Sequence, residues 1–385
     1  MSESGEPSTR AEAWAATMHG RAHGDGRAKV GSAALFGREA REEQEDGWLA
    51  PGATRARGGG DRVRVEEPDP LRTCFERDRD RILHGNAFRR LAGKTQVFVF
   101  PEDHQRTRLT HALEVAQVAT AIAQACRLNV ALAEAIALGH DCGHGPGGHA
   151  SEDAFAPYVP GGFDHAVWGA DVVLAPLNLC AETLDGIRNH SWSRPAPATP
   201  EGEAVAWADR IAYVCHDFED AARAGIVTPA MLPEVVRARC GDLRGEQLGA
   251  FIEAVVSATL VSGEVCMEEE VAEALAAFRA FNYEHIYLRP ASVAQAASVV
   301  KVLRALVEHY ADRPNALPGV EPGPVAAAGP RGARSPGFAA GSEDAWREAV
   351  TYVAGMTDRY AFSLAVSSLG WDPARLPLGV DTRTG

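Results

Sequence analysis

The sequence predicts an all-α protein, and three observations support this prediction. Apolar residues recur at the spacing of a helix face through most of the chain after residue 71, whereas the alternation typical of strands is nearly absent. The 385 residues are 46% hydrophobic, which is enough for a large core in one domain or two. The segment KTQVFVF at 94–100 is β-branched and aromatic, so we expect at most a small β-hairpin there.

Composition divides the chain into three parts. Residues 1–68 are rich in Gly, Ala, Arg and Glu, which predicts a flexible N-terminal segment. Residues 69–278 are expected to form the main helical domain, and residues 279–385 a C-terminal helical region. Inside that region, Pro, Gly and Ala dominate near 313–342, which predicts a disordered loop.

Helical patterns follow one another along the chain. The run NVALAEAIAL, which ends just before Gly139, is typical of a buried amphipathic helix. The last pattern is also amphipathic, so we expect that helix to fold back on the main body. The expected helices cover residues 75–91, 107–128, 130–140, 148–156, 164–174, 178–190, 201–224, 229–238, 245–276 and 343–369.

Charge and cysteine usage exclude several classes of protein. The formal net charge is −14, which makes general binding to nucleic acid unfavourable because phosphate backbones require a positive surface. The seven cysteines show no CxxC spacing, and their odd number is typical of reduced thiols in a cytoplasmic protein. The first residues lack the apolar core of a signal peptide, and no run of eighteen apolar residues predicts a membrane helix.

The most informative string is GHDCGHGPGGHASED. Three histidines and three acidic residues lie within the fourteen positions from His140 to Asp153. Such groups are unfavourable beside an apolar helix unless a cation or a reaction compensates them. The buried helix before Gly139 would deliver His140 and Asp141 together at its end. An imidazole nitrogen and a carboxylate oxygen from adjacent residues can then bind one metal ion.

Two further residues complete a possible ligand set. His111 lies in the middle of the helix predicted for 107–128, and Asp209 lies on the apolar helix predicted for 201–224. With His140 and Asp141 they form an N₂O₂ set from three helices, which suits Mn²⁺, Mg²⁺, Fe²⁺ or Co²⁺ better than a structural zinc ion. Taken alone, His111 could be an ordinary core or surface histidine, and Asp209 an ion-pair partner within its helix.

A candidate proton-transfer pair follows the His-Asp doublet. His149 and Glu152 are three residues apart, so on a helix their side chains can meet. A carboxylate beside an imidazole orients the ring and raises its pKa, which suits general acid or base catalysis. The alternative is a plain helix N-terminus at which Glu152 and Asp153 complement the helix dipole.

Basic residues concentrate upstream of the doublet. Arg108 precedes His111 by one helical turn and is therefore placed to bind a phosphate oxygen beside the metal. Tyr213 and Asp217 follow Asp209 on the same helix face and could present a hydroxyl and a carboxylate to a sugar. The alternatives are a solvated basic helix face and a half-buried core tyrosine. The basic residues are Arg72, Arg77, Arg79, Arg81, Arg89, Arg90, Lys94, Arg106 and Arg108.

From about Arg72 onward, outside the loop near 313–342, the chain resembles the HD-domain family, in particular its deoxynucleoside triphosphate triphosphohydrolase branch (dGTPase-like proteins). Six strings in the order typical of that branch carry the resemblance: RDRDRILHGNAFRRLAGKTQVF, TRLTHALEVAQV, GHDCGHGPGGHASEDAF, LNLCAETLDGIRNHSW, WADRIAYVCHDFEDA and VAGMTDRYA. The resemblance implies a mainly helical HD-domain fold over residues 69–278, with metal-dependent phosphohydrolase activity, and a phosphohydrolase-associated helical extension after it.

The resemblance also implies roles for individual residues. His111, His140, Asp141 and Asp209 match the metal ligands of the family, which agrees with the set inferred from the residues themselves. The other matches are as follows: His149 with Glu152 as the catalytic pair, His144 and His165 at the phosphate site, Arg108 and Arg210 on phosphates, and Tyr213 and Asp217 on the sugar 3′-hydroxyl. The implied reaction releases a deoxynucleoside and tripolyphosphate from a dNTP.

The family pattern also implies partners, and the chain departs from it at four positions. Relatives form ring-like hexamers or similar oligomers, and some use a second nucleotide as an activator. Gly145 and Gly147 stand where proline and phenylalanine are usual, Ser151 where glycine is usual, and Ala166 where asparagine is usual. These changes border His149 and the nucleotide site.

Two other functions remain open at the level of the sequence. One is an HD phosphodiesterase or nucleotidase that acts on another nucleotide. The other is a nucleotide-binding or single-stranded nucleic-acid-binding protein with little turnover, which the basic residues permit and the net charge of −14 disfavours.

Overall fold

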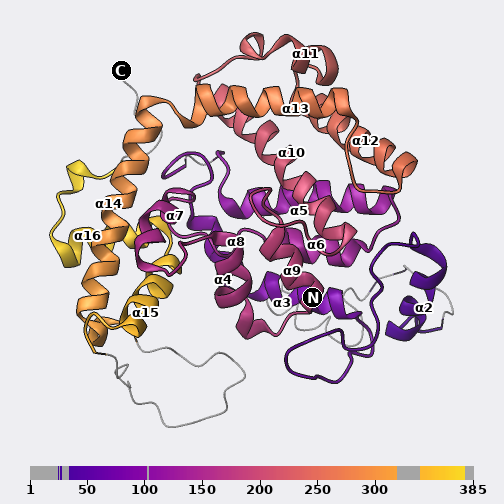
Figure 1. The fold of residues 1–385 in the computed structure, drawn as a ribbon, viewed down its shortest axis with the longest axis horizontal. Helices are drawn as coiled ribbons and strands as arrows, with labels where there is room; N and C mark the ends of the chain where they lie inside the picture. The colour runs from indigo at the N-terminus through magenta and orange to yellow at the C-terminus, as the bar shows by residue number, and fades with distance from the viewer. Residues whose placement is uncertain (1–24, 26, 28–33, 102–103, 319–338, 378–385) are drawn as a thin grey trace, which may run out of the picture. The chain divides into compact units, whose positions relative to one another are not determined.

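Helices make up nearly all the regular structure of the computed structural model, which describes residues 25, 27, 34–101, 104–318 and 339–377 (Figure 1). The all-α fold class is therefore confirmed. The α-helices are α2 (Arg38–Trp48), α3 (Cys74–His84), α4 (Asn86–Arg90), α5 (Arg108–Ala125), α6 (Val130–Gly139), α7 (Ala150–Phe155), α8 (His165–Trp168), α9 (Ala181–Asn189), α10 (Pro200–Arg223), α11 (Glu234–Cys240), α12 (Arg244–Ser262), α13 (Glu269–Asn282), α14 (Pro290–Asp312), α15 (Glu343–Ala354) and α16 (Asp358–Leu369).

Short helical turns connect several of these helices. Two of them are π-helical, and each directly continues an α-helix, namely α8 and α13. The short turns are η1 (Leu91–Gly93), η2 (Ala156–Tyr158), η3 (Gly169–Val173), η4 (Ala175–Leu177), η5 (Pro229–Met231), η6 (Tyr283–Tyr287), η7 (Pro314–Ala316) and η8 (Pro373–Arg375).

Extended structure is limited to single bridges in the described part of the chain. Arg62 bridges Cys180, and Thr95 bridges Thr107, both in antiparallel fashion. The segment at 94–100 is therefore a connector that touches the chain just before α5, and not a hairpin.

Glycines and capping residues explain where the predicted helices end. The single helix expected at 245–276 is two helices, because Gly263 adopts a left-handed conformation (φ 79°) and closes α12. The pattern at 75–91 is likewise divided at Gly85, which ends α3 and precedes α4. At the N-termini, Asn129 and Asp164 accept hydrogen bonds from backbone amides of α6 and α8.

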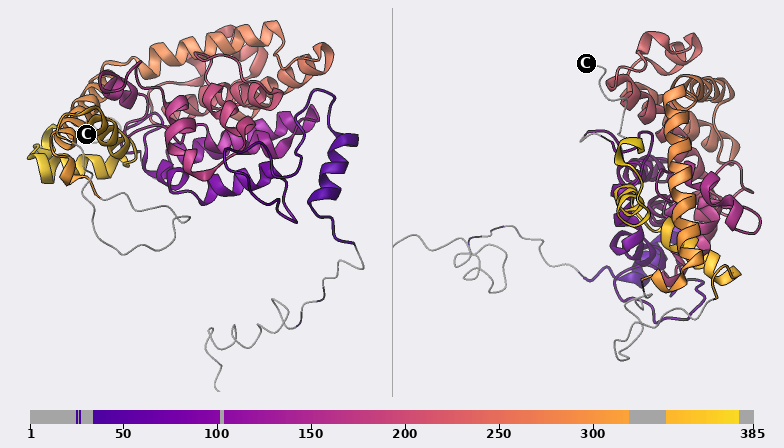
Figure 2. Two further views of the ribbon diagram at one scale, coloured as in Figure 1. Left: turned by 60° about the horizontal axis from the view of Figure 1, so that its bottom comes forward. Right: turned by 90° about the vertical axis from the view of Figure 1, so that its left-hand side faces the viewer.

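The first hydrophobic core lies among the helices from α3 to α13. Helices α5, α6 and α10 pack on one another at its centre, and α3 and α9 contact α6. Helices α12 and α13 pack on α10, which the left view of Figure 2 shows clearly. Fully buried residues of α5 and α6, such as Val115, Ile122 and Ile136, fill this core. The packing fixes the helices that carry the predicted metal ligands.

A second hydrophobic core joins the C-terminal helices to the middle of the chain. Helix α14 packs on α7, α15 and α16, and residues Phe155 and Phe163 from the middle of the chain belong to the same cluster. By length and composition alone α14 could span a membrane. One face of this helix, with Val299, Leu303 and Leu306, is fully buried against these neighbours.

The predicted part boundaries compare with the structure as follows. Residues 38–68, which we expected to be flexible, contain α2 and an extended stretch in which Ala56 and Arg62 are buried. The boundary between 278 and 279 falls inside α13. Most of the loop expected near 313–342 lies outside the described residues, as does most of 1–33.

Candidate metal centre

Three packed helices bring the four predicted metal ligands together. His111 lies in the middle of α5, His140 and Asp141 follow the end of α6, and Asp209 lies on α10. Because α5 contacts both α6 and α10, their side chains meet at one point. His111, His140 and Asp141 are 0–3% exposed, so this polar cluster is buried in the first core.

The distances between these groups are those of a potential metal site. His111 Nε2 lies 3.0 Å from Asp209 Oδ1 and 3.9 Å from Asp141 Oδ2. His140 Nε2 lies 3.5 Å from Asp141 Oδ1 and 3.6 Å from Asp209 Oδ1. One ligand atom from each of His111, His140 and Asp141 falls within 4.8 Å of the others. Two imidazoles and two carboxylates therefore surround a single small volume.

The hydrogen bonds of His140 favour a metal ligand. Its Nδ1 lies 2.6 Å from the carbonyl oxygen of Ala137, which requires the proton on Nδ1. Its Nε2 points away from that bond, and this buried atom has no hydrogen-bond partner in the described part of the chain. A buried lone pair without a donor is unfavourable, and a cation would satisfy it. The residues thus fit a divalent metal ion.

Both carboxylates of the centre are held in the ionised form. Burial opposes ionisation of Asp141, but Arg108, His140 and His144 outweigh it and keep the pKa of Asp141 well below its usual range. For Asp209 burial also opposes ionisation, but the hydrogen bond from His111 and the nearby charges of His140, His111 and His190 together outweigh it, so the pKa of Asp209 is lowered too. Ionised oxygens are the form that binds a metal.

His190 is a residue of this centre that the sequence did not reveal. It caps the C-terminus of α9, and its Nδ1 lies 2.8 Å from the carbonyl oxygen of Ile187. Its Nε2 faces the cluster and groups with His140 and Asp209 within ligand distance. The only signal in the sequence was its place in the string LNLCAETLDGIRNHSW, which assigns no role to a particular side chain.

Glu152 pairs with His165 and not with His149. Glu152 Oε1 accepts hydrogen bonds from the His165 backbone nitrogen at 3.1 Å and lies 2.5 Å from His165 Nδ1. This differs from the expected contact, because His149 is the N-cap of α7 and Glu152 reaches across to the start of α8. His149 is exposed, and its ring centroid lies 5.0 Å from that of His144. His144 stacks on His165 with centroids 3.7 Å apart.

Arg108 offers unused donors beside the metal ligands. The residue is 1% exposed, and its Nη1 donates to Asp141 Oδ2 at 2.7 Å. Its Nε and Nη2 are buried and have no acceptor in the described part of the chain. Such donors are unfavourable unless a ligand supplies oxygens, and a guanidinium matches phosphate in particular.

The residues predicted to contact the sugar form a second group on α10. The Tyr213 hydroxyl accepts a hydrogen bond from Arg279 Nε at 3.0 Å. Asp217 is 3% exposed, its Oδ2 accepts from the Tyr287 hydroxyl at 2.5 Å, and burial raises its pKa to about 7. Arg279 and Tyr287 were missed in the sequence, because they reach α10 from α13 and η6.

Arg210 lies against an aromatic ring and not in an ion pair. Its guanidinium carbon is 3.5 Å from the centroid of the Trp192 ring, which is a cation–π contact. Its Nε is buried and has no partner in the described residues. A phosphate group would supply the missing acceptor.

Gly145 and Ser151, two of the positions at which we expected a departure from the family pattern, contact each other. A Cβ atom at Gly145 would lie 2.6 Å from Phe155 and 2.8 Å from the Ser151 Cβ, so the space of a larger residue is taken. Ser151 Oγ accepts from the Gly145 nitrogen at 3.0 Å and donates to the Gly148 carbonyl at 2.6 Å. The other two positions are also tightly packed. A Cβ atom at Gly147 would collide with Val299 at 2.4 Å. Ala166 is fully buried.

Most of the basic cluster serves the structure. Arg72 pairs with Asp69 and Asp80, and Arg77 and Arg81 pair with Glu66. For these residues the solvated helix face is the correct interpretation. Arg106 is buried in a network with Glu114, Glu219 and Asp220 that joins the start of α5 to α10.

Comparison with known proteins shows the family of this chain. An HD domain matches residues 108–214, and a phosphohydrolase-associated domain matches residues 265–366. A deoxyguanosinetriphosphate triphosphohydrolase-like protein of Caldanaerobacter subterraneus subsp. tengcongensis is 40% identical over 333 residues, which cover 84% of this chain and 93% of the relative. A protein of the same name from Clostridium perfringens (strain 13) is 39% identical over 315 residues, covering 78% and 87%. The chain therefore belongs to the HD-domain family of deoxyguanosinetriphosphate triphosphohydrolase-like proteins.

Proposed function

We propose that this protein is a metal-dependent hydrolase that converts deoxynucleoside triphosphates, dGTP among them, into a deoxynucleoside and tripolyphosphate. The observation that carries the proposal is the buried convergence of two imidazoles and two carboxylates, with His140 Nε2 left without a partner. The names of the relatives and the phosphohydrolase-associated domain matched in this chain support the substrate class.

The metal would be held by His111, His140, Asp141 and Asp209, and Mn²⁺, Mg²⁺ and Fe²⁺ all suit this donor set. When bound, such an ion supplies a Lewis acid for a phosphoryl oxygen. The donors of Arg108 and Arg210 that lack partners would bind the phosphate oxygens and place the α-phosphorus beside the centre.

We assign proton transfer at the scissile bond to His149, which lies next to His144 and His165. Desolvation and the charge of Arg108 lower the pKa of His149 to about 4, contrary to the rise expected from Glu152, so near neutral pH its ring accepts the proton of the attacking water and passes it on. Water attacks the α-phosphorus, the bond from phosphorus to the 5′-oxygen breaks, and that oxygen takes up a proton. Glu152 would act through His165 by fixing the orientation of its ring. Tyr213 and Asp217 would bind the 3′-hydroxyl of the sugar, with Asp217 held by Tyr287.

Product analysis tests this proposal. The purified chain is incubated with Mn²⁺ and an equimolar mixture of the four dNTPs, and the products are separated by ion exchange. Deoxynucleoside with tripolyphosphate is expected, whereas a deoxynucleoside monophosphate with pyrophosphate would contradict the proposed bond cleavage. An Asp209→Ala variant prepared in parallel controls for contaminating phosphatases.

Intact dNTPs in that experiment would overturn the proposal. Hydrolysis of cyclic or monophosphate nucleotides would then identify the phosphodiesterase or nucleotidase alternative. A gel shift with single-stranded DNA that weakens as salt increases would identify the binding protein with little turnover.

We further propose a cytoplasmic homo-oligomer, such as a hexamer, that acts without a membrane and whose activity responds to a nucleotide activator. Exposed apolar side chains on α12 and after η6 support association between copies: Leu260 is 63%, Val261 90% and Leu288 62% exposed. Sedimentation velocity with and without dNTP is the measurement, and a monomer under both conditions would contradict the proposed assembly.

A further inference from the structure

In the described part of the chain, no hydrogen bond or ion pair holds the guanidinium of Arg210. The residue directly follows Asp209 on α10, yet none of its donors has an acceptor among the described residues. A free arginine side chain loses conformational freedom when it binds a ligand, and that loss weakens the binding. A contact that fixes the guanidinium beforehand therefore strengthens the binding of an anion.

The contact that Arg210 does make is with the ring of Trp192. Its guanidinium carbon lies 3.5 Å from the centroid of the ring. At this distance the guanidinium lies flat on the ring, because an edge-on approach would push a nitrogen into the ring atoms. All five N–H donors of a guanidinium lie in its plane, so a flat group keeps them free. Trp192 thus restricts Arg210 without using any donor that a phosphate needs.

The ring of Trp192 is itself fixed to α10. Its Nε1 donates to the carbonyl oxygen of Ala206 at 3.1 Å, and its ring meets that of Trp207 edge-on, with centroids 4.8 Å apart. Ala206 lies four residues before Arg210, and a long side chain on a helix covers the turn that precedes it. The ring of Trp192 therefore lies on the turn of α10 that Arg210 covers.

The loop that carries Trp192 is anchored at both ends. It joins α9 to α10, and the Asp185 carboxylate on α9 accepts from the Asn189 side chain at 2.8 Å and from the Ala198 nitrogen at 2.7 Å. His190, at the start of this loop, lies in the metal centre. One side chain of the loop thus belongs to the centre, and another supports the arginine beside it.

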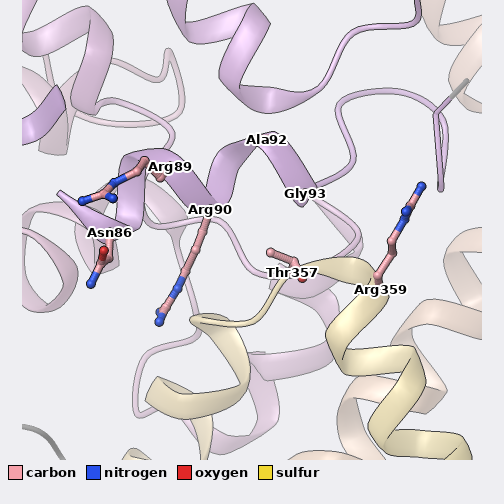
Figure 3. Close-up of a pocket in the computed structure, with 7 residues that line it drawn as sticks. All are labelled: Asn86, Arg89, Arg90, Ala92, Gly93, Thr357 and Arg359. Atoms are coloured by element: carbon pink, nitrogen blue, oxygen red, sulfur yellow. The ribbon is translucent and has the colours of Figure 1, made fainter. Parts of the chain in front are cut away.

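Other arginines without ion pairs are held differently. Arg89, Arg90 and Arg359 line a pocket of about 750 Å³ formed by α4, η1 and the start of α16, which Figure 3 shows. No aromatic residue lines this pocket, and Arg89 and Arg90 donate to backbone carbonyls at 2.8 and 3.1 Å. Three guanidinium–ring contacts occur in the described part of the chain. That of Arg210 is the closest, at 3.5 Å against 4.5 and 5.2 Å.

The surroundings of Arg210 oppose its position when no ligand is bound. Burial and the nearby charge of Arg279 lower the pKa of Arg210, so the place is unfavourable for its positive charge. Asp209 offsets this only in part, because its carboxylate faces the histidines of the centre. An arginine in such a place turns towards water unless a contact retains it, and the ring of Trp192 is that contact.

We propose that Trp192 is a positioning residue, whose ring holds the guanidinium of Arg210 ready to bind a phosphate chain beside the metal centre. The role of Arg210 towards phosphate rests on the proposed function, whereas the stack of the two side chains does not. A cation–π contact of this kind corresponds to about 2- to 30-fold in affinity. Because Trp192 acts only through Arg210, it should affect the binding of the phosphate chain and hence KM more than kcat.

A double-mutant cycle with a phosphate chain tests this role without turnover. Inorganic tripolyphosphate is titrated by calorimetry into the full-length wild type, Trp192→Leu, Arg210→Ala and the double variant. We expect Trp192→Leu to weaken binding about 2- to 30-fold when Arg210 is present and to have no effect in the Arg210→Ala background. An equal loss in both backgrounds, or no loss in either, would overturn the proposal.

Trp48→Leu is the matched control for this cycle. Trp48 is an exposed tryptophan at the end of α2, and the guanidinium carbon of Arg127 lies 5.2 Å from the centroid of its ring. The same change thus removes a similar contact elsewhere, and tripolyphosphate binding should stay unchanged.

Trp192→Phe distinguishes the ring from the bulk of the side chain. This variant keeps a ring face and loses the bond to Ala206, so it should weaken binding less than Trp192→Leu. It takes the place of Trp192→Leu in the cycle if the latter does not fold. An equal loss in the two folded variants would contradict a role of the ring.

Steady-state kinetics with a dNTP and Mn²⁺ extend the test to the reaction. In Trp192→Leu we expect KM to rise while kcat changes less, and we expect no further rise in the Arg210→Ala background. A fall in kcat with an unchanged KM would contradict a role in binding. A wild type that does not hydrolyse dNTPs would overturn the proposed function and leave the tripolyphosphate result standing.

Discussion

At the scale of single residues, the metal centre is recognised by the charged and hydrogen-bonding groups for which the protein itself supplies no partner. His140 and His190 both have Nδ1 at a backbone carbonyl, so both present Nε2 to the cluster. Asp141 and Asp209 are ionised despite their burial. Arg108 and Arg210 retain donors without acceptors. The protein alone therefore leaves this centre incompletely satisfied, which is expected of a site built for a metal and a phosphate ester.

Removal of one proposed metal ligand should abolish both metal binding and turnover. For Asp209→Ala we expect activity to fall at least about 100-fold, since even residues that only orient a ligand contribute about 10–100-fold. Bound Mn²⁺ is measured by inductively coupled plasma mass spectrometry after gel filtration. Asp312→Ala, the same change at an exposed end of α14, should retain metal and activity. Full metal content in Asp209→Ala would exclude it as a ligand.

Loss of the Glu152 carboxylate should slow the reaction without loss of metal. Glu152→Gln weakens the hold on His165 Nδ1, so we expect kcat to fall about 10–100-fold while KM changes little. The pH profile of kcat should shift as well, because the neighbouring charge is gone. Asp153→Asn, on the exposed side of the same helix, is the matched control. An unchanged kcat and pH profile would assign Glu152 a structural role only.

Asp217 should make stability depend on pH. Burial raises its pKa from 3.8 to about 7, so the folded state binds a proton that the unfolded state releases. Its contribution to the free energy of unfolding is therefore retained near pH 4 and declines as the pH rises to about 7. Between pH 5 and pH 8 the decline should be on the order of 2–3 kcal/mol, and Asp217→Asn should abolish it. Urea unfolding at both pH values measures this change in the free energy of unfolding. An equal change in the wild type and in Asp217→Asn would refute the prediction.

At the scale of elements, close backbone contacts place the catalytic groups. The loop after α6 touches the start of α8 directly, because a Cβ atom at Gly143 would lie 1.9 Å from the His165 carbonyl oxygen and 2.4 Å from the Gly169 nitrogen. This contact brings His165 to the doublet. The π-helical turn η3 begins at Gly169 itself, so the irregular backbone lies where two elements approach most closely.

Two glycine substitutions should have opposite effects. Gly143→Ala must push α8 away, and we expect it to destabilise the fold by about 3 kcal/mol or more. Gly249→Ala in α12 meets no atom within 4 Å and removes backbone freedom from the unfolded chain, so it should stabilise the fold by about 0.5–1 kcal/mol. Thermal and urea unfolding compare the two variants. Tolerance of Gly143→Ala would mean that α8 is not tightly docked.

At the scale of the whole molecule, buried ion pairs fasten distant segments to the first core. Arg62 and Asp78 have side chains 1% and 0% exposed and lie 2.6 Å apart. Arg62 also donates to the carbonyl oxygens of Asn178 and Cys74, and Asp78 accepts from the Cys180 nitrogen. The chain before α3 is thereby joined to the start of α9, the helix whose C-terminal end carries His190.

Breaking this pair should destabilise the molecule strongly. Arg62→Met leaves Asp78 buried without its partner, so we expect a loss of about 3–5 kcal/mol and faster proteolysis within residues 49–68. The double variant Arg62→Met/Asp78→Asn, which removes the unpaired charge, should recover part of the loss. Arg64→Met, at an exposed neighbour, is the control. If Arg62→Met and Arg64→Met have the same free energy of unfolding, the ion pair between Arg62 and Asp78 contributes little to stability.

The sequence by itself determined the helical class and the identity of the four candidate metal ligands. Helical spacing is a local property, and His140 and Asp141 are adjacent, so neither required knowledge of the fold. His111 and Asp209 lie 98 positions apart, and their place in the set was supported by the match to the family motifs and not by spacing. The sequence could not determine that Glu152 pairs with His165 or that His190 lies in the centre. It also could not determine that Arg279 and Tyr287 contact the residues of α10. Those contacts join residues 13 to 70 positions apart, and local spacing does not specify them. The tertiary structure alone decided that Lys94 and Asp358 hold the loop at residues 141–149, because the glycines of this loop have no preferred conformation of their own.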